Sequence, residues 1–265
     1  MEKAVPASEF LGLRFDLLTV DEAIVALAEL GGRSQFSYVV TPNVDHVVQL
    51  HRRDSGDALW ASYRAASLSL CDSRVLQLLA RWCGQKLEVS PGSDLTALLL
   101  KSPSPWLESI AVIGGDAQMM ERLRSLRPDL RWFHHEPPMG VRTDAAAQNA
   151  IIDFVEASAG SVAFFAIGAP QSELLCHSIA QRGKASGIGL CIGASLEFVT
   201  GRKRRAPCWV QRLRLEWLFR LITEPRRLAR RYLVDGPHVI KICVRWLQGR
   251  RRAAESSGST SLGER

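Results

Sequence analysis

The sequence lacks the short motifs that most readily identify a metal or a dinucleotide cofactor. Its six cysteines include no CxxC pair, and no Cys/His cluster has the spacing of metal ligands. A GxGxxG fingerprint is also missing, which argues against an enzyme that binds a nicotinamide dinucleotide. These absences exclude the commonest zinc modules and leave the chemistry to be found elsewhere in the chain.

Long apolar runs and a secretory leader are missing as well. No uninterrupted apolar stretch approaches the roughly 18 to 20 residues of a membrane-spanning helix. Glu2 and Lys3 precede a short mixed stretch rather than the apolar region of a signal peptide. Several cysteines lie in apolar runs, which predicts buried free thiols in a reducing compartment. We therefore expect a cytoplasmic protein that is not integral to a membrane.

What the chain does have is an uneven charge. Its 265 residues are 46% apolar and 23% charged, a globular composition, with a net charge of +7. Residues 202–252 hold sixteen Lys or Arg and three acids, a local charge of +13, which leaves −6 for the rest. This split predicts a basic appendage on a mildly acidic body. We expect an α/β core at 1–201, a basic helical appendage at 202–252 and a disordered tail at 253–265.

The first two hundred residues alternate between short apolar runs and segments with helical spacing. Runs such as 161–168 are apolar on both faces, as expected of a parallel strand covered by helices on each side. The pattern predicts a doubly wound, mainly parallel, Rossmann-like α/β fold. The expected strands are 36–40, 67–71, 110–114, 130–134, 162–167 and 188–192, and the expected helices 73–83, 93–100, 117–125, 144–157 and 171–181.

Polar or glycine-rich segments follow five of these strands. Ligands of doubly wound folds bind beyond the carboxyl ends of the strands. Small residues there let backbone N–H groups and helix N-termini approach a phosphate. These strand exits are residues 41–43, 72–73, 114–116, 168–173 and 193–195.

The order of motifs resembles the WecG/TagA/CpsF glycosyltransferases of bacterial surface-polysaccharide synthesis. The resemblance covers roughly Phe36 to Trp246. It is carried by Val40-Thr-Pro-Asn-Val-Asp-His46, Cys71-Asp-Ser73, Pro91-Gly-Ser-Asp-Leu95, Val112-Ile-Gly-Gly115, Gly168-Ala-Pro-Gln-Ser-Glu173, Lys203-Arg-Arg-Ala-Pro207, Leu215-Glu-Trp-Leu-Phe-Arg-Leu221 and Glu224-Pro-Arg-Arg-Leu-Ala-Arg-Arg-Tyr232.

The resemblance implies an inverting hexosyltransferase. Such an enzyme moves a hexose-type sugar, of the N-acetylmannosamine, N-acetylmannosaminuronic acid or glucose class, from a UDP-sugar. The acceptor is a polyprenyl-pyrophosphate-linked sugar at the inner face of the cell membrane, in surface or extracellular polysaccharide synthesis. The protein is then expected to be peripheral on that membrane face.

Direct displacement with inversion needs one general base for the acceptor hydroxyl. Asp72 follows a buried strand and begins the next helix, and the family's base falls on this position; the alternative is a helix N-cap. Thr41 and Asn43 match the family's polar pair near the same pocket, although an Asx-type turn also explains them. The other predicted substrate-binding residues of the core are Gly114, Gly115, Gln171, Ser172 and Glu173.

Four further residues are left open between pocket and structural roles. Asp45 and His46 open the helix after the first strand, where a cap and a half-exposed histidine are the alternatives. His134 and His135 lie beside Pro137-Pro-Met-Gly140, near a predicted strand end.

A bound metal is not expected, because the chain contains no Asp-x-Asp pair to hold a cation beside a diphosphate. Arginine is the natural substitute, since its planar fork binds phosphate bidentately. The resemblance implies that the appendage contributes arginines to the active site, and we expect these among Arg212, Arg220, Arg226 and Arg227.

Two positions depart from the family pattern. Val89 stands where many members carry an arginine, and Ser172 where the common Pro-Lys-Gln-Glu has its glutamine, with Gln171 beside it. Both changes touch expected substrate contacts, and they indicate a subgroup with a different sugar.

The appendage itself predicts three helices. Trp209, Leu213, Trp217 and Leu221 recur every four positions in 207–222, a second helix starts at Pro225 with Thr223 as cap, and a third spans about 237–248. Tryptophans and arginines on short helices suit the headgroup boundary of an anionic membrane. Packing onto the core or an oligomer interface is the alternative. A nucleic-acid-binding protein and a non-catalytic scaffold remain competing functions, although no nucleic-acid motif is present and no nucleic-acid partner is expected.

Overall fold

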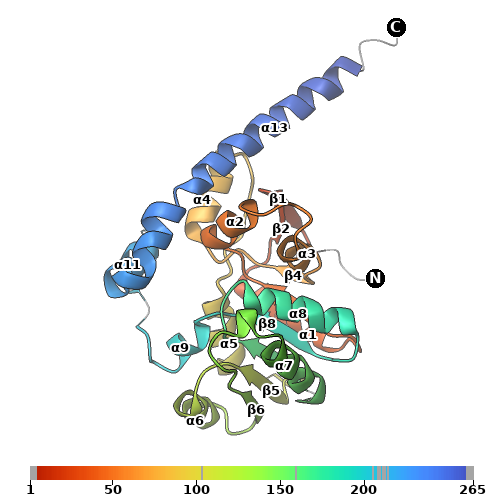
Figure 1. The fold of residues 1–265 in the computed structure, drawn as a ribbon, viewed down its shortest axis with the longest axis vertical. Coiled ribbons are helices and arrows are strands. Elements are labelled where there is room, and N and C mark those ends of the chain that lie inside the picture. The colour runs from red at the N-terminus through yellow and green to blue at the C-terminus, as the bar shows by residue number, and fades with distance from the viewer. Residues whose placement is uncertain are drawn as a thin grey trace.

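The computed structural model describes residues 5–102, 104–158, 160–204, 206–207, 210, 213 and 215–260. In this part of the chain, a six-stranded parallel sheet with helices on both faces forms the body, and one long C-terminal helix leaves it (Figure 1). The predicted doubly wound α/β fold is confirmed.

All six predicted strands are present, each within a few residues of its expected bounds. Their spatial order is β4-β3-β8-β7-β5-β6, and every neighbouring pair is parallel. Each central strand is buried on both faces, which explains its continuous apolar sequence. The strands are β3 Ser37–Val40, β4 Leu68–Ser69, β5 Ser109–Ile113, β6 Arg131–His135, β7 Val162–Phe165 and β8 Ile188–Cys191.

Alternate residues of the strands feed two separate apolar clusters, one on each face of the sheet. Val162 and Phe164 of β7 join one cluster, while Ala163 and Phe165 join the other. The first face is covered by α1 Val20–Gly31, α5 Gly92–Lys101, α6 Ala117–Leu126 and the short α9 Ser195–Val199. The second is covered by α2 Val44–His51, α3 Ala58–Arg64, α4 Arg74–Trp82, α7 Ala145–Ser158 and α8 Gln171–Arg182.

An antiparallel hairpin that the sequence reasoning did not assign precedes this sheet. It pairs β1 Ala7–Phe10 with β2 Leu13–Asp16. Leu11 and Gly12 turn between the strands with φ of 53° and 75°. Asp16 then ties the hairpin to the sheet, because its buried Oδ2 accepts a hydrogen bond from the N–H of Ser69 at 2.8 Å.

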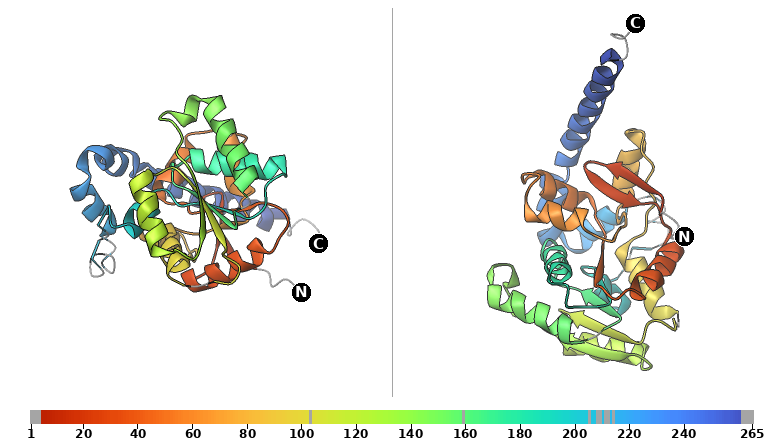
Figure 2. Two further views of the ribbon diagram at one scale, coloured as in Figure 1. Left: turned by 90° about the horizontal axis from the view of Figure 1, so that it is seen from below. Right: turned by 90° about the vertical axis from the view of Figure 1, so that its right-hand side faces the viewer.

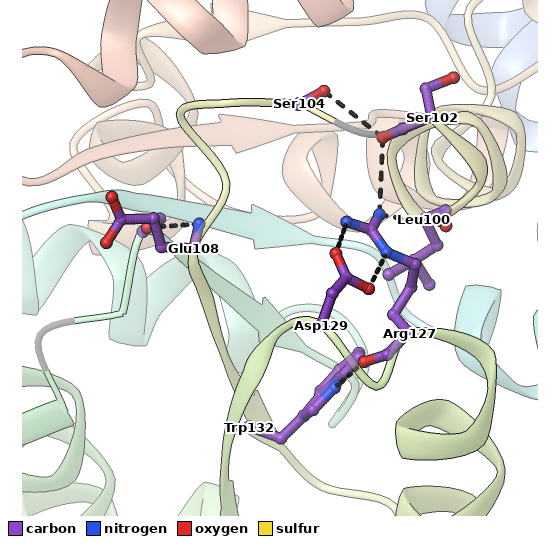
Figure 3. Close-up of polar contacts among 8 residues, drawn as sticks. Leu100, Ser102, Ser104, Glu108, Arg127, Asp129 and Trp132 are labelled. Carbon is purple, nitrogen blue, oxygen red and sulfur yellow. Dashed lines mark hydrogen bonds and ion pairs between the residues drawn. The ribbon is translucent and has the colours of Figure 1, made fainter.

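Arg127 fixes the end of α5 that lies away from the carboxyl edge of the sheet (Figure 3). Its guanidinium donates to both carboxylate oxygens of Asp129, at 2.8 and 2.6 Å, and to the carbonyls of Leu100 and Ser102 at 3.3 and 3.5 Å. The hydrogen bonds with Asp129 raise the pKa of Arg127. A charged group thus caps the C-terminal carbonyls of α5 and holds this helix in place.

The C-terminal segment differs from the prediction at three points. Helix α11 is Glu216–Thr223, and Leu215 lies before it with its N–H bonded to the carbonyl of Val210 at 3.0 Å, so 207–222 is not one continuous helix. Thr223 does not cap the next helix, α12 Pro225–Ala229. It donates to the carbonyl of Phe219, and Glu224 occupies the cap position. Trp209 lies outside the described residues.

The third difference concerns the last helix. A π-helical segment, Arg230–Asp235, leads to α13, which spans His238–Thr260. The predicted end near 248 is therefore too early, and α13 enters the segment expected to be disordered. The reason is local composition, since residues 250–255, Arg-Arg-Arg-Ala-Ala-Glu, are all strong helix formers.

Only the first part of α13 packs on the body. Val239 and Cys243 are buried in the second-face cluster, and the ring of Trp246 meets Phe10 edge-on at 5.3 Å. Ile240 and Val244, on another side of the helix, are 58% and 48% exposed. The C-terminal part of α13 projects away from the body in Figure 1 and in the right view of Figure 2. Within α13, the packing alternative thus holds for the first turns; elsewhere in the appendage Val210 and Leu228 are also buried.

None of the described helices combines sufficient length with sufficient apolarity to cross a membrane. The five described cysteines are free, and all but Cys83 are buried, as predicted; Cys208 lies outside the described residues.

Candidate active site

A cleft of about 840 Å³ lies at the carboxyl ends of four adjacent strands, β4, β3, β8 and β7. The segments that follow these strands form its floor, as the pattern of strand exits predicted. They contribute Thr41 and Asn43 after β3, Asp72 and Ser73 after β4, Gly168 and Ala169 after β7, and Gly193 and Ala194 after β8.

The C-terminal segment closes one side of the cleft. Its lining residues come from three places, namely the turn before α11, the start of α11 and the start of α13. They are Leu213, Glu216, Trp217, Gly236, Pro237, Val239 and Ile240. The described residues by which this segment reaches the cleft are apolar residues, two residues of the loop before α13 and one carboxylate, and none of them is an arginine. An ion pair joins Arg52, the residue after α2, to Asp235 and so links this wall to the body.

Helices α2, α4, α5 and α8 begin at this cleft, as do the short α9 and, from the C-terminal segment, α11 and α13. These N-termini give the cleft the character of an anion site. The first turns of α2, α4, α5 and α8 all supply lining residues. The N-terminus of a helix presents unpaired N–H groups and about half a positive charge. Their convergence favours a ligand that carries phosphate.

Asp72 lies on the floor with its carboxylate fixed. Its Oδ1 accepts a hydrogen bond from the N–H of Gly92, the first residue of α5, at 3.1 Å. The N-cap interpretation is wrong, because Ser73 caps α4 and accepts from the N–H of Leu76 at 3.2 Å. The half-buried carboxylate of Asp72 thus faces the cleft without serving the helix that follows it.

Thr41 and Asn43 both line the cleft, on the segment next to Asp72. Thr41 is buried, and its hydroxyl donates to the carbonyl of Cys191 at 3.1 Å. Asn43 caps α2, where its Oδ1 accepts from the N–H groups of Asp45 and His46 at 3.0 and 3.3 Å. The Asx-type interpretation of Asn43 is therefore correct, and it does not remove the residue from the cleft.

Of the four residues left open, Asp45 and His46 line the cleft, and His134 and His135 do not. Asp45 accepts from the side chain of Gln49 at 2.7 Å rather than capping α2. His134 and His135 lie on β6, the edge strand farthest from β4. His134 Nε2 lies 3.2 Å from the carbonyl of Gly114.

The glycine pair after β5 also lies outside the cleft. Gly114 and Gly115 have φ of 95° and 75°, and a Cβ on Gly115 would lie 2.7 Å from the sulfur of Met119. The geometry of the turn between β5 and α6 is therefore sufficient to explain why glycine occupies both positions. Strand β5 lies next to β7, just outside the four strands that carry the cleft.

The Gln171-Ser-Glu173 segment begins α8 and is buried. Ser172 and Glu173 line the cleft, whereas Gln171 does not. The hydroxyl of Ser172 donates to the carbonyl of Gly168 at 3.1 Å. Val89, the other departure from the family pattern, lines the cleft and pairs with Cys71, directly beside Asp72.

Glu173 has a strongly perturbed carboxyl group and lines the cleft. Burial raises its pKa from the usual 4.5 to about 7. The hydroxyl of Tyr63 donates to Oε1 at 3.3 Å, while Oε2 has no hydrogen-bond partner among the described residues. A buried carboxyl with an unused oxygen at a cleft surface is suited to a ligand hydroxyl or amide.

Of the four predicted appendage arginines, three have side chains outside the described residues. They are Arg212, Arg220 of α11 and Arg227 of α12. Arg226 is exposed and does not line the cleft. In their place, the described lining contains Arg74, the first residue of α4, which the sequence reasoning missed. An arginine at a helix start gives no sequence signal that separates a site residue from a solvated one.

In the described part of the chain, no group of three or more His, Cys, Asp or Glu is placed to hold a metal ion.

The raised pKa of Glu173 predicts a pH-dependent cost in stability. Between pH 4.5 and about 7 the folded state binds more protons at this carboxyl than the unfolded state, so stability falls as the pH rises through this window. The Glu173→Gln protein should therefore gain roughly 3 kcal/mol relative to wild type between pH 5 and pH 8. Thermal denaturation of both proteins across this range measures the difference.

The matched control is Glu121→Gln, which changes an exposed glutamate of α6. Its melting curve should follow wild type at every pH. If the stabilities of wild type and Glu173→Gln changed with pH in parallel, the predicted cost of ionising a buried Glu173 would be excluded.

A parallel sheet with a cleft of helix N-termini and carboxylates at its carboxyl edge is an architecture of enzymes that bind phosphate-bearing substrates. Residues 8–253 match the Glycosyl transferase WecG/TagA/CpsF family. The chain belongs to this family.

One curated relative shows how far the likeness extends. The chain is 34% identical over 84 residues to the N-acetylglucosaminyldiphosphoundecaprenol N-acetyl-beta-D-mannosaminyltransferase of Bacillus spizizenii. This match covers 31% of the chain and spans 32% of the relative's length.

Proposed function

We propose that the protein is an inverting glycosyltransferase. It transfers a hexose-type sugar, of the N-acetylmannosamine, N-acetylmannosaminuronic acid or glucose class, from a UDP-sugar to a polyprenyl-pyrophosphate-linked sugar. This places it in bacterial surface or extracellular polysaccharide synthesis. The family membership supports the reaction class, and the name of the Bacillus relative supports a lipid-diphosphate-linked acceptor.

The observation that carries the proposal is the setting of Asp72. Its carboxylate faces a cleft at which several helices begin, and the Gly92 N–H holds it in position. As general base it takes the proton of the acceptor hydroxyl, whose oxygen then forms a bond to the anomeric carbon of the donor sugar. The bond from that carbon to the diphosphate oxygen breaks on the opposite face, so UDP leaves and the configuration inverts.

The negative charge that develops on the leaving UDP needs stabilisation. The first turns of α2, α4, α5 and α8 place positive dipole ends at the cleft. We further propose that Arg212, Arg220 or Arg227 of the adjoining C-terminal segment completes this stabilisation without a metal ion.

The projecting helix suggests where the enzyme works. Lys241, Arg245 and Arg252 are exposed, and their spacing of four and seven residues places them on one side of α13. The exposed Ile240 and Val244 lie beside them. We propose that this side of α13 binds anionic lipid at the inner face of the cell membrane, which carries the acceptor.

The reaction is tested by offering purified protein a panel of UDP-sugars together with a short-chain lipid-diphosphate-linked sugar, with UDP release as the readout. We expect release above the acceptor-free background with a hexosamine or hexose donor, and no loss of rate when a metal chelator is added. Absence of acceptor-dependent UDP release across the panel would reject the proposed reaction. A strict requirement for Mg²⁺ would reject metal independence alone.

A further inference from the structure

The charges that line the cleft do not match a diphosphate ligand unless a cation takes part. Four carboxyl groups, those of Asp45, Asp72, Glu173 and Glu216, belong to the described lining, and burial raises the pKa of Glu173 to about 7. Within that same lining, Arg74 is the sole Lys or Arg. A diphosphate is itself negatively charged and is repelled by these acidic groups. The positive charge of Arg74 offsets this repulsion at the place where Arg74 lies.

Arg74 also lies at a helix start where backbone N–H groups have no acceptor within the described part of the protein. It is the first residue of α4, and its side chain is exposed at the cleft. The Ser73 hydroxyl accepts a hydrogen bond from the N–H of Leu76, and the Ser73 carbonyl accepts one from the N–H of Gln77. Among the described residues, the N–H groups of Arg74 and Val75 have no hydrogen-bond acceptor, and the Arg74 guanidinium has no ion-pair partner.

We propose that Arg74 binds the diphosphate group of a substrate, together with the N–H groups of Arg74 and Val75. This inference rests on the proposed function. An arginine fork donates two parallel hydrogen bonds to phosphate oxygens, and the start of α4 adds two more donors and a positive dipole end. Because Arg74 lies two residues after Asp72, the diphosphate is held close to the carboxylate that acts on the acceptor hydroxyl.

Two substrates of the reaction carry this group, namely the UDP-sugar and the polyprenyl-linked acceptor. The test therefore titrates the full-length protein with UDP and, separately, with a short-chain polyprenyl diphosphate, using calorimetry. The variants are Arg74→Gln, which removes the charge, and Arg74→Lys, which keeps the charge and loses the fork. The control is Arg81→Gln, an exposed arginine at the other end of α4 that does not line the cleft.

We expect Arg74→Gln to weaken the binding of one of the two diphosphates by about 10- to 100-fold, with Arg74→Lys in between. The salt dependence of that binding should also become shallower, which a purely structural effect would not cause. Weakened UDP binding assigns Arg74 to the donor, and weakened polyprenyl diphosphate binding assigns it to the acceptor. Arg81→Gln should bind both as wild type does.

Unchanged affinity of Arg74→Gln for both diphosphates overturns the inference, as does an equal loss in Arg81→Gln. If the wild-type protein transfers sugar while Arg74→Gln binds normally, the inference fails and the proposed function stands. Wild-type protein that binds neither diphosphate and releases no UDP overturns both.

Discussion

Replacing Asp72 by Asn is expected to lower the rate of sugar transfer by about 10²- to 10⁴-fold. Asparagine keeps an Oδ1 that can accept the Gly92 N–H, so the floor of the cleft should retain its shape. It cannot take a proton from the acceptor hydroxyl, so the chemical step alone is affected. The measurement is kcat for UDP release with saturating donor and acceptor.

Two controls separate loss of the base from loss of the site. The melting temperature of Asp72→Asn and its affinity for UDP should both remain close to those of wild type. Turnover within a fewfold of wild type would exclude Asp72 as the general base. A parallel loss of UDP affinity would point instead to a collapsed cleft.

The second large effect is expected at the membrane. Changing Lys241, Arg245 and Arg252 together to Gln should weaken binding to anionic vesicles on the order of 10²-fold, because each basic residue near anionic lipid contributes about 1 kcal/mol. The measurement is co-sedimentation with vesicles of equal parts phosphatidylglycerol and phosphatidylcholine. These residues do not line the cleft, so release of UDP with a water-soluble acceptor should persist.

A matched triple variant tests whether position matters beyond net charge. Lys86, Lys101 and Lys184 are exposed cations of the α/β body, and their replacement by Gln removes the same charge. Their loss should change vesicle binding by much less. Equal weakening in both variants would mean that overall charge, and not the side of α13, attracts the protein to lipid.

The central sheet could be read from the sequence because parallel strands buried on both faces leave short continuous apolar runs. Periodicity failed near Leu213, where an apolar repeat of four continues through a turn. There the N–H of Leu215 bonds back to Val210, and a helical pattern contains nothing that marks such a turn. The end of α13 was missed for the opposite reason, since the strong helix formers before the Ser/Gly-rich tail were given too little weight.

The site could be predicted in part. Strand ends that are polar stand out, and Thr41, Asn43, Asp72, Ser172 and Glu173 all line the cleft. The search for polar or glycine-rich strand ends also selected Gly114 and Gly115, which lie outside the cleft. The order of strands along the chain does not reveal which strands are neighbours in the sheet. The raised pKa of Glu173 likewise depends on its burial in the folded protein, and the sequence around position 173 contains no sign of that burial.

The wall that the C-terminal segment adds to the cleft has a consequence for biosynthesis. Chains emerge from the ribosome N-terminus first, and domains fold as units in that order. All six strands of the sheet precede residue 192, whereas the wall extends to Ile240. The sheet can therefore assemble while the residues of the wall are still being translated, and the cleft is complete only after that wall has joined the sheet.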